Sequence, residues 1–494
     1  MIYRSTRSDI QANSLEAVLK GLAPDGGLFV DPAIGTRSFD WQHCLTLNEF
    51  GMAEMILSFL LPDFEDMGGL VRRAYLGKFD NDRLAPLVKC GSAYVMELFH
   101  GPTSAFKDVA LSMLPQLVTA ARRQLGIDED IVILTATSGD TGKAALEGFH
   151  DVDGTGIIVF YPDGGVSPVQ RAQMVTQCGA NVHVCAVKGN FDDCQRGVKE
   201  AFSMLGAEAC GKRLSSANSI NIGRLAPQVI YYFSAYAQLL ADKAISPGNK
   251  VDFIVPTGNF GDILAGYYAK LMGLPVGRLV CAANENRVLR DFIENGVYDA
   301  RRPFVRTSSP SMDILVSSNL ERLLFIASGG NAGAVRTWMD ALKKDGVYSV
   351  DKATHANIRE VFSAGYAGEA ATRAAIKRIW EEDGYLCDPH TAVAFSVLDS
   401  YRKSGDYRGN MCVVLSTASP FKFPAAVLDA VGGQLSGDGF SEMEELSRIS
   451  GRTIPRNLAS LRGMPEKHRD LIRREDILDY VKDVLNNRQE EEHI

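Results

Sequence analysis

The chain has 494 residues, of which 46% are hydrophobic and 23% are charged, and its formal net charge is −8. At roughly 100–200 residues per domain, this length predicts two to four domains with a large buried core. The balance of 52 basic and 60 acidic residues argues against nucleic acid or an anionic membrane as the main partner. No apolar run approaches the roughly 18–20 residues that cross a bilayer.

The cysteines and histidines indicate a reducing compartment and no metal site. Nine cysteines are scattered along the chain without a C-x-x-C pair, and the eight histidines fall singly. The N-terminus, MIYRSTRSDIQ, lacks the apolar core of a signal peptide. We therefore expect a cytoplasmic protein without disulfides and without a bound metal.

The first 90 residues mix amphipathic patterns, and EFGMAEMILSFLL (49–61) is the clearest predicted helix. From about residue 91, continuous apolar strands alternate with helical stretches. The predicted strands cover 131–136, 156–162, 181–187, 251–256 and 278–284. Strands that are apolar on both faces and separated by helices predict an α/β fold with parallel sheets covered on both sides.

The last part of the chain has a different character. LDAVGGQLSGDG (428–439) is a glycine-rich joint, and the segment 465–486 predicts one or two charged amphipathic helices. We expect three units: an N-terminal mixed domain over 1–90, a catalytic region of two α/β lobes over 91–430, and a helical C-terminal extension over 431–494.

Ligands of parallel α/β sheets bind where loops leave the carboxyl ends of the strands. The first unusual loop is ELFHGPTSAFKD (97–108), in which Lys107 follows a Gly-Pro turn in an apolar setting. Poor solvation lowers the pKa of a lysine and frees its amine to act as a nucleophile. The alternative is an ordinary helix lysine that extends to the surface.

Two further loops combine glycines with a helix start, which is an arrangement that binds anions. ILTATSGDTG (133–142) contains Ser138, Gly139, Asp140 and Thr141 and suits a carboxylate, although a plain capped turn would look similar. It is not a Walker A loop, because Ala follows its lysine. FIVPTGNFGDIL (253–264) contains Gly258, Asn259, Phe260, Gly261 and Asp262 and suits a phosphate, unless it is only a structural turn.

Two more segments complete the set of candidates. ANSINIGR (217–224) contains Asn218, Ser219, Asn221 and Arg224, and arginine offers a planar fork of donors that matches phosphate. The alternative is a capped helix with a surface arginine. CVVLSTASP (412–420) places the hydroxyl of Thr417 at a strand end, where it could meet a ring nitrogen or simply end the strand. Together, these features predict a pyridoxal phosphate (PLP) site that accepts an acidic substrate.

Seven segments, in this order, resemble the threonine synthase family of the bacterial and fungal type, in the tryptophan-synthase-β fold group of PLP enzymes. They are STR (5–7), GLAPDGGLFV (21–30), ELFHGPTSAFKD (97–108), LTATSGDTG (134–142), SSANSINIGR (215–224), PTGNFGD (256–262) and LSTASPFKF (415–423). The resemblance implies a fold-type II PLP enzyme. In that fold, two parallel-sheet lobes enclose a cleft, beside an N-terminal domain and a helical C-terminal extension.

The resemblance also implies roles for single residues. Lys107 matches the family's Schiff-base lysine, and Thr417 matches the hydroxyl beside the pyridine nitrogen. The 258–262 loop matches the loop that binds the cofactor phosphate. The 138–141 loop matches the one near the substrate carboxylate, with Asp140 beside the cofactor ring. Asn218, Ser219, Asn221 and Arg224 fit the group that holds the substrate phosphate. Ser419 and Phe421 depart from the family pattern, in which we expect histidine and alanine.

The activity implied by the resemblance is that of a lyase that converts O-phospho-L-homoserine and water to L-threonine and phosphate, in a monomer or homodimer. Two other readings stay open. One is a PLP-dependent dehydratase or phospho-lyase that releases an oxo acid and ammonia. The other is a non-catalytic relative that binds an amino acid.

Overall fold

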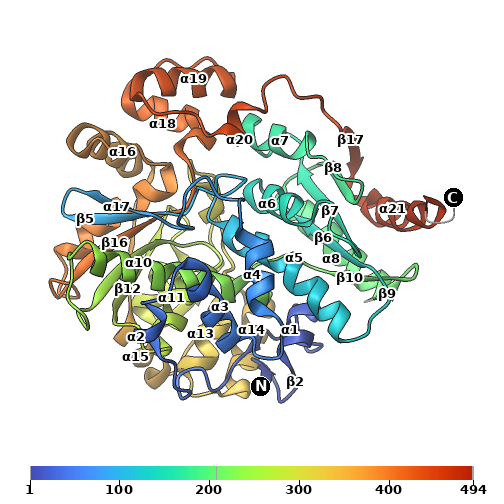
Figure 1. Cartoon of the computed structure of the whole chain (residues 1–494), viewed down its shortest axis with the longest axis horizontal. Coiled ribbons are helices and arrows are strands. Elements are labelled where there is room, and N and C mark those ends of the chain that lie inside the picture. Colours follow the sequence, from blue (N-terminus) through green and yellow to red (C-terminus); the bar gives the residue numbers. More distant parts are fainter. Residues whose placement is uncertain (1, 207, 492–494) are drawn as a thin grey trace.

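The computed structural model describes residues 2–206 and 208–491, and two six-stranded sheets form its framework (Figure 1). We call the sheet with β6 and its helices the small lobe, and the sheet with β11 and its helices the large lobe. The small-lobe strands, in spatial order, are β17 (Asp470–Arg473), β8 (Val182–Lys188), β7 (Thr155–Pro162), β6 (Ile131–Ala136), β10 (Lys212–Ser215) and β9 (Glu208–Ala209). All neighbours are parallel except β10 and β9.

The large-lobe sheet is also almost entirely parallel, with one antiparallel pair, β5 and β4, at its edge. Its strands, in spatial order, are β15 (Phe362–Tyr366), β12 (Val276–Ala283), β11 (Val251–Pro256), β16 (Met411–Ser416), β5 (Ala93–Glu97) and β4 (Leu87–Cys90). Every residue of β7 and β11 is buried. Strands buried on both faces are those of a parallel sheet between helices, and the predicted α/β architecture is confirmed.

Helices connect the strands and cover both sheets. In the small lobe they are α5 (Lys107–Gln124), α6 (Asp140–Phe149), α7 (Pro168–Val175) and α8 (Phe191–Leu205). In the large lobe they are α9 (Ile222–Leu225), η1 (Ala226–Gln228), α10 (Val229–Ala241), α11 (Gly261–Leu271), α12 (Val288–Asn295), η2 (Pro310–Met312), α13 (Leu320–Ala327), α14 (Ala332–Asp345), α15 (Lys352–Val361), α16 (Glu369–Asp383), α17 (Pro389–Arg402) and η3 (Pro420–Lys422). Strands β13 (Val297–Asp299) and β14 (Val347–Ser349) form a separate two-stranded antiparallel sheet.

The N-terminal segment packs against α5 and α10. It contains a small sheet of β2 (Gln11–Ala12), β1 (Tyr3–Ser5) and β3 (Phe29–Val30), and the helices α1 (Ser14–Lys20), α2 (Trp41–Cys44), α3 (Glu49–Leu60) and α4 (Met67–Tyr75). Helix α3 confirms the helix predicted over 49–61. The guanidinium of Arg7 binds Glu321 of α13 in a bidentate pair, with both N–O distances at 2.8 Å. The ion pair fastens the start of the chain to the large lobe.

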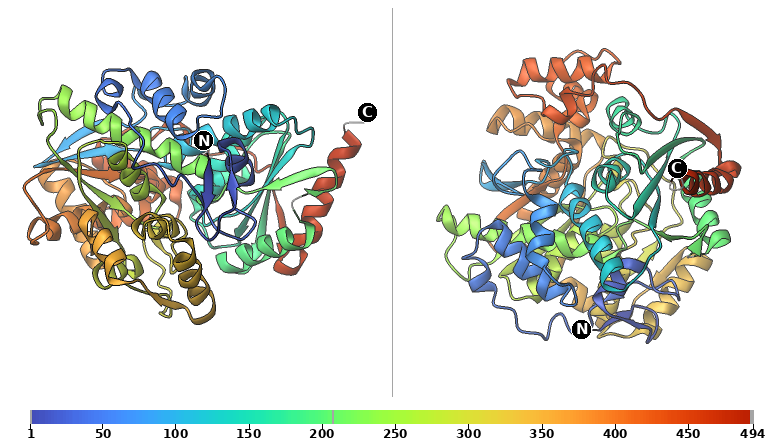
Figure 2. Two further views of the ribbon diagram at one scale, coloured as in Figure 1. Left: turned by 90° about the horizontal axis from the view of Figure 1, so that it is seen from below. Right: turned by 45° about the vertical axis from the view of Figure 1, so that its right-hand side comes forward.

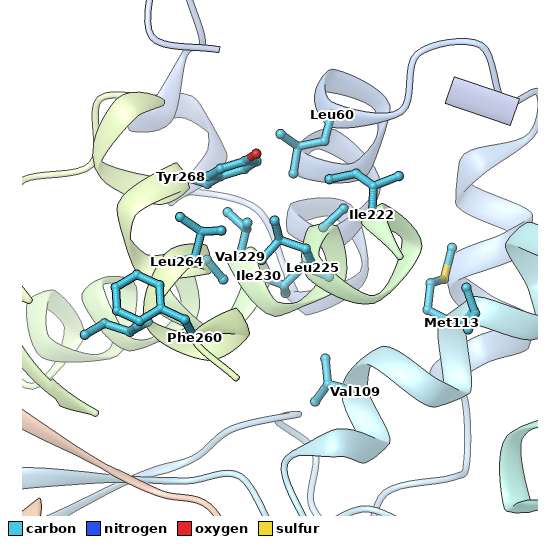
Figure 3. Close-up of a cluster of buried hydrophobic side chains, with 14 of the residues drawn as sticks. Leu60, Val109, Met113, Ile222, Leu225, Val229, Ile230, Phe260, Leu264 and Tyr268 are labelled. Atoms are coloured by element: carbon cyan, nitrogen blue, oxygen red, sulfur yellow. The ribbon is translucent and has the colours of Figure 1, made fainter. Parts of the chain in front are cut away.

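One hydrophobic cluster packs around the first turns of the helices that carry the predicted site residues (Figure 3). Val109 and Met113 of α5 belong to this cluster together with Ile222 and Leu225 of α9, and the two helices pack against each other. Phe260 belongs to the same cluster and precedes α11. Because all these side chains are buried, the starts of α5, α9 and α11 are held in fixed relative positions.

The C-terminal part returns from the large lobe to the small one (Figures 1 and 2). It contains α18 (Pro424–Val431), α19 (Gly439–Ser450), α20 (Arg456–Ala459), β17, η4 (Arg474–Asp476) and α21 (Ile477–Glu491). Helix α18 packs on α16, whereas α21 packs on α8. The last three residues of the predicted 431–494 extension lie outside the described residues.

The prediction of helix over 465–486 is wrong over 465–473, because residues 465–469 form no helix and residues 470–473 form β17. This strand pairs in parallel with β8, with Leu471 opposite Ala186. Strand β8 would otherwise leave its backbone donors and acceptors unpaired at the sheet edge, and β17 satisfies them. The predicted amphipathic helix begins only at Ile477, and it buries Ile477, Val481 and Leu485.

No helix among the described residues combines the length and the apolar character needed to cross a bilayer.

Candidate active site

Lys107 is the first residue of α5, and its side chain is almost completely buried. Its Nζ lies 3.3 Å from Ser311 Oγ and 3.7 Å from Asp140 Oδ2, and it sits 4.7 Å from the centre of the Phe106 ring. Burial lowers the pKa of Lys107 to about 8, with Lys422 and Arg224 acting in the same direction and Asp140 against it. The amine is therefore available as a nucleophile near neutral pH, and the surface-lysine alternative is wrong.

Asp140 begins α6 and is the acidic neighbour of Lys107. Its Oδ1 lies 2.7 Å from Lys422 Nζ and accepts a hydrogen bond of 2.9 Å from Gln170. Burial alone would raise the pKa of Asp140, but Lys422 and Lys107 outweigh it and hold that pKa well below its ordinary value. Lys422 is completely buried. Its ion pair with Asp140 was not predicted from the sequence, because a lysine that follows a strand is usually a surface residue.

The loop before α6 is a tight anion-binding turn. Gly139 has a φ of 135°, which L side chains rarely adopt, and an added Cβ would lie 2.5 Å from the Gln170 side chain. Thr137 holds the turn, because its hydroxyl accepts hydrogen bonds from the Gly139 and Gly142 amides at 3.0 and 2.8 Å. Ser138 and Thr141 are half-buried beside it. The glycine and the flanking hydroxyls leave room for a carboxylate at the start of α6.

The second glycine loop joins β11 to α11. A Cβ on Gly258 would lie 2.5 Å from the Ser311 carbonyl oxygen, so this position accepts only glycine without a shift of the chain. Phe260 has a φ of 63° and is held in this uncommon conformation by its buried ring. Asn259 is exposed, and its carbonyl accepts a hydrogen bond of 3.0 Å from the Asn319 amide. Gly261 then starts the 11-residue helix α11, whose free amides favour an anion.

Asp262 lies in the first turn of α11 and is buried. Its Oδ1 accepts hydrogen bonds from Tyr231 and Tyr232 at 2.6 and 3.1 Å, whereas its Oδ2 has no partner among the described residues. Burial raises the pKa of Asp262 to about 7, although both tyrosines and Lys107 oppose this. A carboxyl that is partly protonated near neutral pH repels a neighbouring phosphate less than an ordinary aspartate does.

Arg224 is buried without a carboxylate partner in the part of the chain that the structure describes. One guanidinium nitrogen donates to the Ala217 carbonyl at 2.5 Å, and Nε has no partner. Burial lowers the pKa of Arg224 to about 10. The positive charge of Arg224 acts on Lys107, because it helps to lower the pKa of that amine. A buried guanidinium that lacks both an anion and a full set of hydrogen bonds is costly unless a ligand supplies the missing acceptor and the negative charge.

The other predicted phosphate ligands are placed differently. Asn221 caps α9: its Oδ1 accepts from the Gly223 amide at 2.8 Å and its Nδ2 donates to the Val18 carbonyl at 2.8 Å. Asn218 is exposed, and Ser219 is half-buried with its hydroxyl 3.4 Å from Ser318. Asn218 and Ser219 can therefore still meet a ligand, whereas the Asn221 side chain is already used by the fold.

Thr417 is buried directly after β16, and its carbonyl accepts a hydrogen bond of 2.8 Å from the Phe106 amide. This bond places the residue next to the start of α5. Ser419, which departs from the family pattern, caps η3 by accepting from the Phe421 amide at 3.4 Å. Phe421 is buried. Both departures therefore shape the turn that carries Lys422.

The loop over residues 300–319, which contains η2, places Ser311 beside Lys107 and was not predicted as part of the site. The Ser311 amide donates to His390 Nε2 at 3.1 Å, and His390 Nδ1 lies 2.5 Å from Asp388 Oδ2. Asp313 ties the loop to β12 by accepting from Asn284 at 2.7 Å. No sequence motif marks this loop, because its serines and asparagines are typical of any surface loop.

The residues present fit PLP. A buried amine with a lowered pKa, a glycine turn that excludes a Cβ, a helix start and a hydroxyl at the end of β16 meet at one edge of the large-lobe sheet. These are the groups that bind a pyridine ring, its aldehyde and its phosphate. Within the described residues, no group of three His, Cys, Asp or Glu side chains could hold a metal ion.

Comparisons with known proteins give the same class and then the family. Residues 79–417 match the family of pyridoxal-phosphate dependent enzymes, residues 2–86 match the threonine synthase N terminus, and residues 391–484 match the threonine synthase C-terminal family. The fold and the site thus define a PLP-dependent enzyme of fold type II. Within that class, the chain belongs to the threonine synthase family.

Individual relatives are similar over nearly their whole lengths. The threonine synthase of Pseudomonas aeruginosa is 39% identical, with 95% of this chain and 98% of the relative covered. That of Saccharomyces cerevisiae is 38% identical, with 91% and 93% covered. The structure of PLP-bound threonine synthase from Brucella melitensis aligns with a TM-score of 0.86 at 39% identity, over 98% of this chain and 99% of the other.

Proposed function

We propose that the protein converts O-phospho-L-homoserine and water to L-threonine and phosphate, the last step of threonine biosynthesis. The observation that carries this proposal is the buried Arg224, which has no carboxylate partner among the described residues. It provides a second anion site, apart from the glycine loop of the cofactor, that acts electrostatically on Lys107. A substrate that carries both a carboxylate and a phosphate uses both remaining anion sites.

The site residues have the following proposed roles toward the cofactor. Lys107 attaches it, the 258–262 loop and the start of α11 bind its phosphate, and the Thr417 hydroxyl faces its ring nitrogen. When bound, PLP supplies an electron sink for charge that develops on the substrate. A hydroxyl partner leaves the ring nitrogen unprotonated, which favours chemistry at the β- and γ-carbons over transamination.

The remaining roles concern the substrate. Lys107 removes the proton from the α-carbon and is the nearest base for the later transfers at the β- and γ-carbons. Ser138, Gly139 and Thr141 hold the carboxylate at the start of α6. Arg224, with Asn218 and Ser219, holds the phosphate and stabilises the charge that builds on it as it leaves. We assign Asn221 a structural role, because both of its polar side-chain atoms are bonded within the fold.

The test is a product assay on the PLP-loaded protein with O-phospho-L-homoserine, in which phosphate, threonine and 2-oxobutyrate are all quantified. Equal amounts of phosphate and threonine are expected. Phosphate with 2-oxobutyrate would move the assignment to a lyase that releases an oxo acid. No phosphate at all would show that the role given to Arg224 is wrong.

Lys107→Ala is the first variant to make. The variant should lose the covalently attached cofactor and all turnover, because Lys107 is the amine proposed to attach the cofactor and to move the protons. The absorbance of bound PLP and the product assay measure the two effects. A Lys107→Ala protein with normal turnover would remove the basis of the mechanism.

Location and assembly complete the proposal. A cytoplasmic location is supported by the nine free cysteines, which need no oxidising compartment. A net charge of −8 supports small molecules, not nucleic acid, as the ligands. Sedimentation of the purified protein distinguishes the monomer from the homodimer.

A further inference from the structure

Asp140 lies between two buried lysines, and this arrangement crosses from one lobe to the other. Its Oδ1 is 2.7 Å from Lys422 Nζ, and its Oδ2 is 3.7 Å from Lys107 Nζ. Asp140 belongs to α6 of the small lobe, whereas Lys422 ends η3 of the large lobe. The side chains of Lys107, Asp140 and Lys422 are 9%, 2% and 0% exposed, so solvent screens none of the three charges.

The two lysines are held unequally. Lys422 donates to Asp140 and to the Thr103 carbonyl at 3.0 Å, so its ammonium has two strong acceptors. Lys107 is a full ångström further from Asp140. Its other neighbours are the Ser311 hydroxyl, which accepts from it at 3.3 Å, and the Phe106 ring at 4.7 Å, so its ammonium is held less firmly than that of Lys422. If Lys107 and Lys422 are both charged beside the single Asp140 carboxylate, the buried cluster carries one excess positive charge. Loss of a proton from one of the two lysines makes the cluster neutral.

We infer that Lys422 is a positioning residue that fixes Asp140 as an anion and supplies the standing positive charge, so that the proton is lost from Lys107. The inference rests on the proposed function only in taking Lys107 as the nucleophile. The lowered pKa of Lys107 agrees with it, because burial, Lys422 and Arg224 lower that pKa while Asp140 and Asp108 raise it.

The charged groups that act on Lys107 come from five elements. They are Asp108 of α5, Asp140 of α6, Arg224 of α9, Asp262 of α11 and Lys422 of η3. Only Asp140 and Lys422 form an ion pair with each other within this set, so changing either alters the charge beside Lys107 in a known direction.

The full-length, cofactor-free protein allows a direct measurement. Trace acetylation with acetic anhydride at a series of pH values, followed by mass spectrometry of the Lys107 peptide, gives the pH at which half of the amine is neutral. Lys422→Met should raise this midpoint by a pH unit or more, which slows labelling at pH 7 about tenfold. Asp140 then has Lys107 as its only lysine partner and holds the proton on it.

Asp140→Asn should move the midpoint in the opposite direction, since it removes the anion that favours the charged amine. Lys143→Met is the matched control. Lys143 is a buried lysine of α6, but it pairs with Glu147 at 2.9 Å and not with Asp140. In this variant the labelling midpoint of Lys107 should equal that of the wild type. A merely structural role for the ion pair would open the site in both variants and raise both midpoints toward that of a free lysine.

Opposite shifts support the inference. An unchanged midpoint in Lys422→Met, or a raised one in Asp140→Asn, overturns it, and the second variant decides alone if the first does not fold. The product assay on the loaded wild type separates this result from the proposed function. If the wild type makes threonine but neither variant shifts the midpoint of Lys107, the proposed function stands and the role inferred for Lys422 is wrong.

Discussion

At the scale of single residues, the site is built from charges that burial makes costly. Arg224 has no carboxylate beside it within residues 2–206 and 208–491, and Asp262 leaves one carboxylate oxygen without a hydrogen bond there. A folded protein tolerates such groups where a ligand or a reaction uses them. Each of them therefore predicts a change in stability as well as in activity.

Replacing Arg224 with Gln should separate the two effects. We expect kcat/KM for O-phospho-L-homoserine to fall roughly 100-fold, about 2.7 kcal/mol, because the substrate phosphate loses its cation. The melting temperature should rise, since a buried unpaired charge is removed. Arg322→Gln is the control for stability: Arg322 is also buried, but it donates to Phe29, Asn319 and Ile220, and its loss should lower the melting temperature. A fall for both variants would contradict the assignment.

Asp262→Asn should change how stability depends on pH. The pKa of Asp262 is raised from 3.8 to about 7 in the folded protein, so the folded state binds the extra proton between these values. Stability from this group is therefore greatest below pH 4 and falls as the pH rises to 7, by on the order of 4 kcal/mol. Urea unfolding at pH 5 and pH 8 should show a smaller difference for the variant than for the wild type. Equal differences would show that Asp262 titrates normally.

At the scale of elements, the site depends on contacts between loops that are distant in sequence. The 300–319 loop reaches Gly258 and Lys107 only because Asp313 and His390 fasten it to β12 and α17. These contacts join residues about 30 to 200 positions apart. Such a loop is positioned by tertiary contacts, so local patterns carry no sign of its role.

Gly258→Ala should loosen that loop. The added methyl would lie 2.5 Å from the Ser311 carbonyl, so the loop must move, and overpacking of this kind costs roughly 1–3 kcal/mol. We expect faster proteolysis within 300–319 and at least a tenfold weaker affinity for PLP. Gly261→Ala is the matched control, because its methyl would meet its nearest side-chain atom at 3.4 Å, an ordinary contact. Equal proteolysis of the two variants would show that the loop does not rest on Gly258.

The sequence predicted the elements that have strong local signals. The parallel strands and the two glycine loops were predicted because buried apolar runs and glycine-rich helix starts are local patterns. The role expected for Lys107 came from the family resemblance. Strand β17 was missed, since its four residues lie in a charged, helix-like segment and become a strand only by pairing with β8. Lys422 was missed because its burial depends on both lobes. The boundaries at residues 90 and 430 stay predictions.

At the scale of the whole molecule, the C-terminal part links the lobes. Helix α18 packs on α16 of the large lobe, while β17 and α21 complete the small lobe (Figure 1). A Cβ on Gly197 would lie 2.3 Å from Ile477 Cδ1, so α21 seats directly on α8. The small lobe therefore depends on residues that lie beyond every predicted site residue in the sequence.

Ile477→Ala should lower the free energy of unfolding by about 2–4 kcal/mol, because it leaves a cavity in the core between α8 and α21. The kcat should stay unchanged, since Ile477 belongs to a separate buried cluster of the small lobe that contains no predicted site residue. Leu471→Ala is the control, because that side chain is 46% exposed and its removal should have little effect. Chemical denaturation measures the difference, and an equal effect of both changes would contradict the packing described for α21.

Strands β16 and β17 lie late in the sequence, and this position determines when the protein can finish folding during its synthesis. Strand β16 must insert between β5 and β11, and β17 must cover β8, yet both are translated long after their neighbours. Until then, a nascent chain on the ribosome exposes strand edges that can pair with other chains. Neither sheet can therefore be completed until its late strand has been synthesised, and a chain that ends before β17 leaves the edge of β8 uncovered.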